Sequence, residues 1–246
     1  MRKIVKYLPA AFIVITAILF LGFKKNINLQ ELQTYNTPHF TIYYEKLNPQ
    51  TLKDLEQKLE TNYPDMQNFF GVNNNGNSKV IVYKSVERFQ RAYLGVFLSY
   101  MFGDWAAGAA YEDLVLLTSP ENPGQEHTYA SILEIAVHEH VHTLVYQVNQ
   151  NPDIWLDEGV ATYLAEQQSD LSDLPAPTFE QMQSQSQGEF VESEGYAWGY
   201  AYVDYLVTTY GAEKVVDLIT TNDYERCLGK SQLAVYEEWM THMGSK

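Results

Sequence analysis

The stretch Ile135-Ala136-Val137-His138-Glu139-His140-Val141-His142-Thr143-Leu144 contains the pattern His-Glu-x-x-His. Its outer histidines, His138 and His142, are four residues apart, so a helix places both imidazoles on one face, one turn apart. Two imidazoles in that arrangement can bind one metal ion at about 2.0–2.1 Å, the distance that zinc prefers to nitrogen. Glu139 is the next residue around the helix, where its carboxylate can take a proton from a water activated by the metal. The spacing therefore predicts a metal-dependent site on a helix.

The residues around this pattern favour a helix that is buried on one side. Thr128 is a suitable N-cap, and apolar residues then recur at helical intervals. His140 is about 200° around the helix from His138, at 100° per residue, so it cannot share the same metal. We expect His140 to pack in the interior or to contact the ligands from behind. The apolar positions are Leu133, Val137, Val141, Leu144 and Val148.

A second segment can supply a third ligand: Pro152-Asp153-Ile154-Trp155-Leu156-Asp157-Glu158-Gly159-Val160-Ala161-Thr162-Tyr163. Catalytic zinc takes three protein ligands and keeps one position open for water. Fifteen residues separate His142 from Glu158, which is enough for a short turn and a returning helix capped by Asp153. We expect Gly159 to let the two helices approach closely. A glutamate by itself is more often a solvated helix carboxylate, but this setting favours a ligand.

Together the two segments resemble the zinc site of the gluzincin metallopeptidases, the peptidase MA-like clan of thermolysin and the aminopeptidase N family. The resemblance lies in His-Glu-x-x-His followed by Trp-Leu-x-Glu-Gly-x-Ala-x-Tyr, and it covers about residues 128–210. It implies one Zn²⁺ ion bound by His138, His142 and Glu158. It also implies that Glu139 is the general base. Thr162 is at a position where some gluzincins have an acidic residue that orients a histidine, so the groups that orient the two imidazoles stay open.

A third stretch, Tyr196-Ala197-Trp198-Gly199-Tyr200-Ala201-Tyr202-Val203-Asp204-Tyr205-Leu206, is similar to the Tyr-x-x-Gly sequence of aminopeptidase-like gluzincins. The tyrosine of that sequence hydrogen-bonds the oxyanion that forms during peptide hydrolysis. The resemblance therefore implies a catalytic role for Tyr196, with Tyr200 in reserve. A tyrosine in a chain with 19 of them is otherwise more often a packing or surface residue.

Aminopeptidase N relatives carry Gly-x-Met-Glu-Asn on the strand before the metal helix, where the glutamate binds the amino terminus of the substrate. The corresponding stretch here is Gly108-Ala109-Ala110-Tyr111-Glu112-Asp113, which has one extra residue and lacks the methionine and asparagine. One extra residue in a strand turns a side chain to the opposite face, so Glu112 is a poor candidate for that role. The strand backbone could still pair with an extended peptide.

The first 25 residues predict export to a membrane. A basic start with Arg2, Lys3 and Lys6 precedes an apolar run over residues 7–23, which Lys24 and Lys25 follow. The run is at the short end of what spans a bilayer, and no Ala-x-Ala-like cleavage site follows it. We therefore expect an uncleaved, single-pass signal anchor over residues 1–25, with a cleaved, secreted protein as the alternative. The basic start favours a catalytic domain outside the cytoplasm.

Composition indicates an acidic protein with a substantial core. Hydrophobic residues make up 46% of the chain, which is ample for a globular domain, and the formal net charge is −15. Setting aside the five basic residues of the first 25 leaves eleven Lys and Arg against all 31 Asp and Glu, a net charge of −20. Such a charge argues against nucleic acid as a partner. Cys227 is the sole cysteine, so the chain forms no internal disulfide.

The distribution of apolar residues predicts an α+β fold: a small β-sheet with helices, followed by a mainly helical, thermolysin-like zinc-binding half. We expect a linker over residues 26–36 and one metallopeptidase domain over residues 37–246. Within that domain we expect a loop over residues 103–110. We also expect an irregular segment over residues 167–194 around one short helix that Thr178 caps, with solvated glutamines and serines. The expected strands cover residues 40–44, 79–83 and 114–117; the expected helices outside the two metal-binding segments cover residues 48–70, 193–210, 212–220 and 231–243, with another from residue 85.

The sequence thus predicts a membrane-anchored zinc metallopeptidase that hydrolyses peptide bonds in a peptide or protein substrate. The alternative is a catalytically idle module at the membrane that binds or assembles with another protein through the same fold. A third interpretation, a helical protein without a metal, holds if His138, His142 and Glu158 do not converge. The substrate, the choice between endopeptidase and exopeptidase action, and the oligomeric state stay open.

Overall fold

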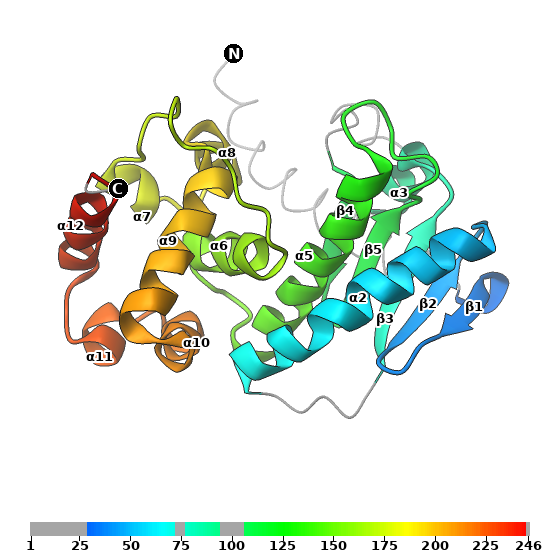
Figure 1. The fold of residues 1–246 in the computed structure, drawn as a ribbon, viewed down its shortest axis with the longest axis horizontal. Coiled ribbons are helices and arrows are strands. Elements are labelled where there is room, and N and C mark those ends of the chain that lie inside the picture. Colours follow the sequence, from blue (N-terminus) through cyan, green and yellow to red (C-terminus); the bar gives the residue numbers. More distant parts are fainter. Residues whose placement is uncertain (1–28, 72–76, 94–105, 245–246) are drawn as a thin grey trace, which may run out of the picture.

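The computed structural model describes residues 29–71, 77–93 and 106–244. It contains a five-stranded sheet on one side and a group of helices on the other (Figure 1). The α+β class predicted from the sequence is therefore confirmed. The predicted signal anchor over residues 1–25 lies outside the described residues. Among the residues that are described, no helix combines the length and the apolar character needed to cross a membrane.

The sheet has the strand order β1-β2-β3-β5-β4. The two central pairings, β2 with β3 and β3 with β5, are parallel, whereas β1 and β4 each join an edge in the antiparallel direction. Side chains alternate between the two faces, so Val80 and Val82 enter the main core and Ile81 enters a smaller core on the opposite face. The strands are β1 Gln33–Asn36, β2 Phe40–Tyr44, β3 Ser78–Tyr83, β4 Gly108–Tyr111 and β5 Leu114–Thr118.

Two strands form where the sequence predicted none. Residues 26–36, predicted as a linker, contain a 3-10 helix at Leu29–Glu31 and strand β1, in which Thr34 pairs with Tyr43. The described end of the predicted loop over residues 103–110 is strand β4, which pairs with β5. Both strands have four residues and few β-branched side chains, so their own sequence gives a weak signal. Backbone pairing with a neighbouring strand determines their conformation instead.

Helices cover both faces of the sheet (Figure 1). Helix α2, Pro49–Phe70, begins at the Asn48 cap and continues without a break past Pro64, and it packs with α5 over the main core. Helix α3, Val86–Tyr93, packs against β3 and β5, where Phe89 enters the smaller core. Both helices begin and run where the sequence predicted them.

Helix α5, Tyr129–Val148, connects the two halves of the molecule. It contacts β4, β5 and α2 on the sheet side and α6 on the helical side. Thr128 caps it with a capping box, and the predicted apolar face is buried at Val137, Val141 and Leu144. The helix that carries the His-Glu-x-x-His pattern is thus fixed from both sides.

The helical half begins with α6, Ile154–Leu164, whose N-cap is Asp153 as predicted. The predicted irregular segment over residues 167–194 contains the short helix α7, which Thr178 caps as predicted, and a second short helix, α8, that was not predicted. The short helix α11, which precedes the last helix, was not predicted either. The remaining helices are α7 Phe179–Gln183, α8 Gln187–Glu192, α9 Gly195–Tyr210, α10 Ala212–Thr221, α11 Tyr224–Leu228 and α12 Gln232–Met243.

Gly159 permits a close approach between helices, but its partner is α9 rather than α5. A Cβ atom at Gly159 would lie 2.8 Å from Val203 Cγ2 and 2.9 Å from the carbonyl oxygen of Gly199. The prediction that Gly159 brings the two metal-binding helices together is therefore wrong. Glu158, the preceding residue, is directed toward α5. Successive side chains on a helix are rotated by about 100° around its axis, so Gly159 faces α9 instead.

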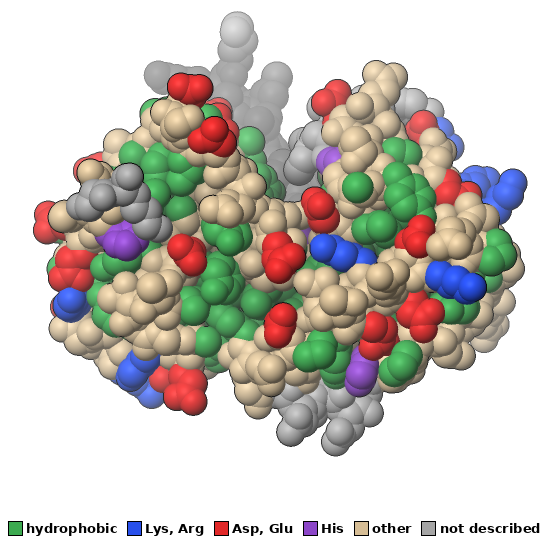
Figure 2. All heavy atoms as spheres, in the orientation of Figure 1, with side chains coloured by type: hydrophobic (Ala, Val, Ile, Leu, Met, Phe, Trp, Pro, Cys, Tyr) green, Lys and Arg blue, Asp and Glu red, His purple; other side chains and the backbone are tan. Residues whose placement is uncertain are grey.

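Acidic side chains are spread over both halves on the face drawn in Figure 2, and the described Lys and Arg side chains there form only small separate groups. This distribution agrees with the net charge of −15.

Candidate metal centre

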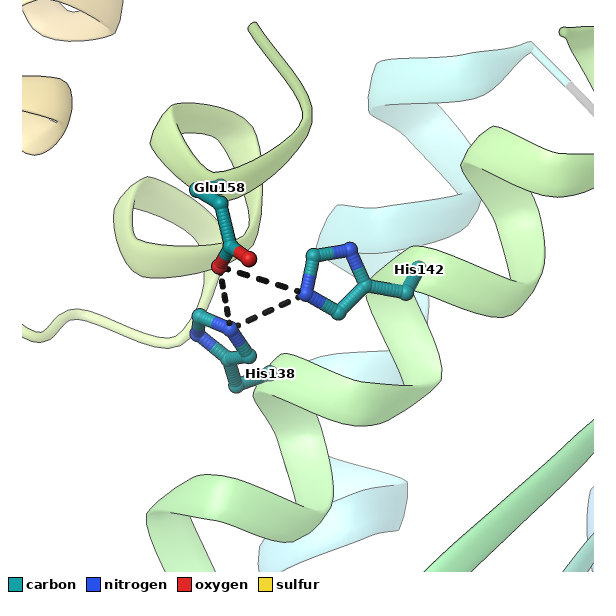
Figure 3. A group of neighbouring side chains, drawn as sticks. All are labelled: His138, His142 and Glu158. Atoms are coloured by element: carbon teal, nitrogen blue, oxygen red, sulfur yellow. Dashed lines mark hydrogen bonds and ion pairs between the residues drawn. The ribbon is translucent and has the colours of Figure 1, made fainter. Parts of the chain in front are cut away.

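Three predicted ligands converge at the interface between α5 and α6 (Figure 3). His138 and His142 extend from α5, and Glu158 extends toward them from α6. Glu158 Oε2 lies 3.3 Å from His138 Nε2 and 3.5 Å from His142 Nε2, and the two Nε2 atoms are 3.0 Å apart. These three residues form a group that could hold a metal ion. The interpretation in which the three side chains stay apart is wrong.

The distances fit a small divalent cation. Ligand atoms placed about 2.0–2.1 Å from a tetrahedral zinc ion are separated from one another by roughly 3.4 Å. The observed separations of 3.0, 3.3 and 3.5 Å are close to that value. Glu158 Oε2 is also buried without a hydrogen-bond partner. A buried carboxylate oxygen beside two imidazole nitrogens is costly unless a positive charge compensates it.

The outer nitrogen of each imidazole has a hydrogen-bond acceptor. His142 Nδ1 lies 2.7 Å from Asp157 Oδ1, and His138 Nδ1 lies 2.9 Å from Gln167 Oε1. Because a carboxylate oxygen only accepts, His142 carries its proton on Nδ1, and the amide oxygen of Gln167 selects the same form of His138. Both Nε2 atoms are therefore directed toward Glu158, and they are the nitrogens that would ligate a metal in place of a proton. The sequence analysis had left these two partners open.

Gln167 reaches His138 through the end of α6. The amide of Gln167 donates to the carbonyl oxygen of Thr162, and the amide of Glu166 donates to that of Tyr163, which is the Schellman arrangement. Glu166 occupies the left-handed position, with φ of 59°, where glycine is the usual residue. The prediction that the glutamines of residues 167–194 are solvated is wrong for Gln167, which contacts His138. No local pattern indicated its role, because α6 had to be placed first.

The electrostatics of the three ligands favour a positive charge between them. Burial alone would raise the pKa of the Glu158 carboxyl, but the imidazoles of His142 and His138 lower it well below its ordinary value. Burial lowers the pKa of His142, yet the carboxylates of Asp157 and Glu158 raise it well above its ordinary value. The same attraction would stabilise a bound cation.

Glu139 lies beside the ligands, against the edge strand of the sheet. A Cβ atom at Gly108 in β4 would come within 2.9 Å of Glu139 Cγ and 2.4 Å of Ile135 Cγ2. The absence of a side chain at Gly108 thus lets β4 pass directly over the carboxylate. Burial raises the pKa of Glu139, and the neighbouring imidazoles only partly offset this effect. Glu139 is therefore poorly hydrated, and it lines the same cavity as His138 and His142.

A cavity of about 720 Å³ opens in front of these residues and is lined by both halves of the molecule. The sheet side contributes Tyr93, whose pKa is raised by burial and by the Glu139 carboxylate. Glu112 also lines the cavity, from the two-residue turn between β4 and β5, where its φ is 53°. Glu112 was expected on a strand face, but it lies in the turn because Tyr111 already pairs with Leu114.

Tyr196 lines the same cavity from the first turn of α9. Its ring centroid is 6.3 Å from that of His138, and its side chain is 39% exposed. Burial raises the pKa of the Tyr196 hydroxyl, and the carboxylates of Glu158 and Glu139 raise it further, so the hydroxyl keeps its proton. Tyr200 does not line the cavity and packs on Tyr163, at 5.6 Å between ring centroids.

His140 is part of the interior, as predicted. It is 1% exposed, and its ring meets that of Phe40 edge-on with 4.9 Å between centroids. Burial lowers its pKa to about 4, so it is neutral at physiological pH. The third histidine of the stretch thus packs α5 onto the sheet.

Comparison with models of known protein families gives no match for this sequence, and comparison with curated proteins gives none either. The candidate metal centre is therefore supported by its geometry alone.

Proposed function

We propose that this protein is a zinc metallopeptidase of the gluzincin type, anchored in a membrane by its first 25 residues, with its catalytic domain outside the cytoplasm. The observation that carries the proposal is the convergence of His138, His142 and Glu158 with Glu139 beside them in one cavity. Two histidines and a glutamate are a ligand set of catalytic zinc, which leaves a position for water. The position of the metal helix between a small sheet and a helical half supports the same proposal.

Each residue of the site has a chemical task in this proposal. Zinc held by the three ligands supplies Lewis-acid activation of a water and of the peptide carbonyl. Asp157 and Gln167 hold the imidazoles of His142 and His138 in the form that ligates. Glu139 accepts the proton of the attacking water and delivers it to the departing amine. Tyr196 donates a hydrogen bond from its hydroxyl to the oxyanion and keeps its proton.

The edge of the sheet offers a way to bind an extended peptide. Strand β4 is last in the strand order, pairs with β5 on one side, and lines the cavity with Gly108, Ala109 and Ala110. The edge of β4 away from β5 pairs with no other described strand. Backbone hydrogen bonds along such an edge recognise a peptide without regard to its side chains. We therefore expect a peptide or protein substrate bound in an extended conformation across Glu139.

Metal content and peptide turnover test the proposal. The full-length wild type should bind about one equivalent of zinc and cleave members of a mixed library of internally quenched peptides. The variant Glu139→Gln should keep its zinc and lose about 10²–10⁴-fold in turnover, which is the usual contribution of a general base. Turnover at the wild-type rate in this variant would contradict the role of Glu139. Equal zinc in the wild type and in His142→Ala would contradict the metal centre itself.

The same measurements distinguish the alternative function. A binding or assembly module at the membrane would retain a full equivalent of zinc without cleaving any peptide of the library. An intact ligand set accompanied by Glu139 favours the enzyme, since a fold that has lost catalysis has no use for a base at that position.

A further inference from the structure

The short helix α8 contacts the side chain of Tyr196 at both its ring and its hydroxyl. Gln187 and Phe190 are three residues apart on α8, so both lie on the same side of the helix. The ring of Phe190 meets the Tyr196 ring edge-on, with 5.2 Å between centroids. Gln187 Nε2 lies 3.2 Å from the Tyr196 hydroxyl. One helix of six residues thus fixes both the ring and the hydroxyl of the candidate oxyanion donor.

Phe190 is itself firmly placed. It is fully buried, and its ring packs edge-on against Trp155 of α6, with 5.0 Å between centroids. A Cβ atom at Gly195 would come within 2.5 Å of the Phe190 ring, so the glycine lets the chain turn from α8 into α9 across that ring. Glu194 makes this turn with φ of 54°. Gln187 therefore extends from a helix that the buried ring of Phe190, on the same side, fixes to the core.

The amide of Gln187 also contacts a metal ligand. Its Nε2 atom lies 3.4 Å from Glu158 Oε1, in addition to its contact with Tyr196. A carboxylate oxygen only accepts hydrogen bonds, so the amide nitrogen, not the amide oxygen, must face Glu158. The same nitrogen then donates its second hydrogen to the Tyr196 hydroxyl oxygen. With that lone pair engaged, the hydroxyl proton of Tyr196 is available to an acceptor in the cavity.

We propose that Gln187 is a positioning residue, which ties the Tyr196 hydroxyl to Glu158 so that this hydroxyl donates to the oxyanion of the bound substrate. The inference rests on the proposed function. The inference goes beyond that function because it assigns a role to Gln187, a residue of the segment over residues 167–194. The sequence predicted that the glutamines of this segment are solvated. Gln187 acts through Tyr196 and does not touch the reacting atoms.

Substitutions at Gln187 test this role in the full-length, zinc-loaded protein. Gln187→Ala should lower kcat about three- to tenfold, as expected for one hydrogen bond, with little change in KM. Gln187→Glu should lower kcat further, because a carboxylate would accept the hydrogen bond of the Tyr196 hydroxyl and would repel Glu158. Gln183→Ala is the matched control, since Gln183 is an exposed glutamine at the end of α7 and does not line the cavity.

Two readouts separate positioning from a structural effect. The first is the affinity of a peptide phosphonate, whose tetrahedral oxygens resemble the oxyanion; it should fall by the same factor as kcat/KM. The second is the double variant Tyr196→Phe/Gln187→Ala, which should be no slower than Tyr196→Phe alone. Zinc content and thermal unfolding should match the wild type in Gln187→Ala.

The outcomes distinguish this inference from the proposed function. Wild-type kinetics and phosphonate affinity in Gln187→Ala, or a further loss of the same size in the Tyr196→Phe background, would overturn the role of Gln187 while leaving the peptidase intact. A drop in zinc content that accounts for the lost activity would also overturn it. If the zinc-loaded wild type neither cleaves the peptide library nor binds the phosphonate, the proposed function fails and this inference fails with it.

Discussion

The two sides of the metal centre are built in different ways. On the sheet side, one helix supplies His138, Glu139 and His142, and α5 is held between the sheet and α6. On the helical side, four separate segments supply the residues: Asp157 and Glu158 come from α6, Gln167 from the turn after it, Gln187 from α8 and Tyr196 from α9. The first set is fixed by helix geometry, whereas the second depends on how several elements pack.

Residues with strained backbone lie on both sides of the cavity, one of them being Glu112 on the sheet side, with φ of 53°. Glu166 and Glu194 adopt left-handed φ values of 59° and 54°, and they precede Gln167 and the first turn of α9, respectively. Such a conformation costs a residue other than glycine about 1–2 kcal/mol. Within α5 the described residues show no positive φ. The helical side thus has strained residues directly before two of its polar groups, Gln167 and Tyr196, and we expect the placement of these groups to be sensitive to substitution.

Loss of a ligand from either side should have the largest effect. Glu158→Gln and His142→Ala should each lower zinc affinity by more than the about 10–100-fold that is typical of an outer hydrogen-bond partner. Competition with a chromogenic chelator measures these affinities, with the exposed Glu192→Gln as control. Unchanged affinity in Glu158→Gln would mean that the helical side contributes no ligand.

The outer partners of the two histidines should come next. Asp157→Asn should weaken zinc binding about 10–100-fold, because a carboxylate that orients an imidazole is replaced by a neutral amide. Gln167→Ala should have a smaller effect, since a hydrogen bond to a neutral carbonyl is weaker than one to a carboxylate. The same chelator competition ranks the two variants, and a larger loss in Gln167→Ala would reverse the proposed order.

Close packing between α6 and α9 should affect stability more moderately. Gly159→Ala would place a methyl group against Val203 and Gly199, and we expect a loss of about 1–3 kcal/mol in the free energy of unfolding. Gly188→Ala in α8 is the control, because a Cβ there would meet only Ser186 Oγ at 3.8 Å.

Denaturant unfolding of the two variants compares them directly. Gly188→Ala should match or exceed the wild type, since alanine favours a helix by up to about 1 kcal/mol over glycine. Equal stability of Gly159→Ala and the wild type would show that α9 can shift without cost, and that the placement of Tyr196 is not under packing control.

The smallest effect should appear on the sheet side, away from the metal. Glu60 of α2 accepts hydrogen bonds from Thr37 Oγ1 and from the amide of His39, and it lies 2.6 Å from His39 Nδ1. Burial raises the pKa of the Glu60 carboxyl, but these contacts outweigh it and lower the pKa. The ionised carboxylate therefore stabilises the fold above its unfolded pKa of about 4.3, and this contribution disappears as the pH falls through the folded value.

Thermal unfolding of Glu60→Gln as a function of pH tests whether the ionised Glu60 carboxylate stabilises the fold. The variant should be less stable than the wild type at pH 7, and the difference should vanish in acid. A difference that persists unchanged at low pH would indicate packing of the side chain rather than its charge. Zinc binding at pH 7 should equal that of the wild type, because Glu60 is in α2, which carries none of the three ligands.

Sequence reasoning was most successful where a signal is contained in one element. The Thr128 and Asp153 caps, the buried face of α5 and the position of His140 all follow from helix periodicity and local hydrogen bonding. The edge strands β1 and β4 and the short helices α8 and α11 were missed, because each is too short to carry a periodic pattern.

The sequence by itself determined the helix that carries His138, Glu139 and His142, because residues one and four positions apart on a helix have fixed relative positions. It also indicated Glu158 as their partner. Only the tertiary structure decided that Asp157 and Gln167 orient the imidazoles, that Gly159 faces α9, and that Gln187 reaches Tyr196. These contacts join residues from different elements, and their geometry arises from packing between those elements rather than from any spacing along the chain.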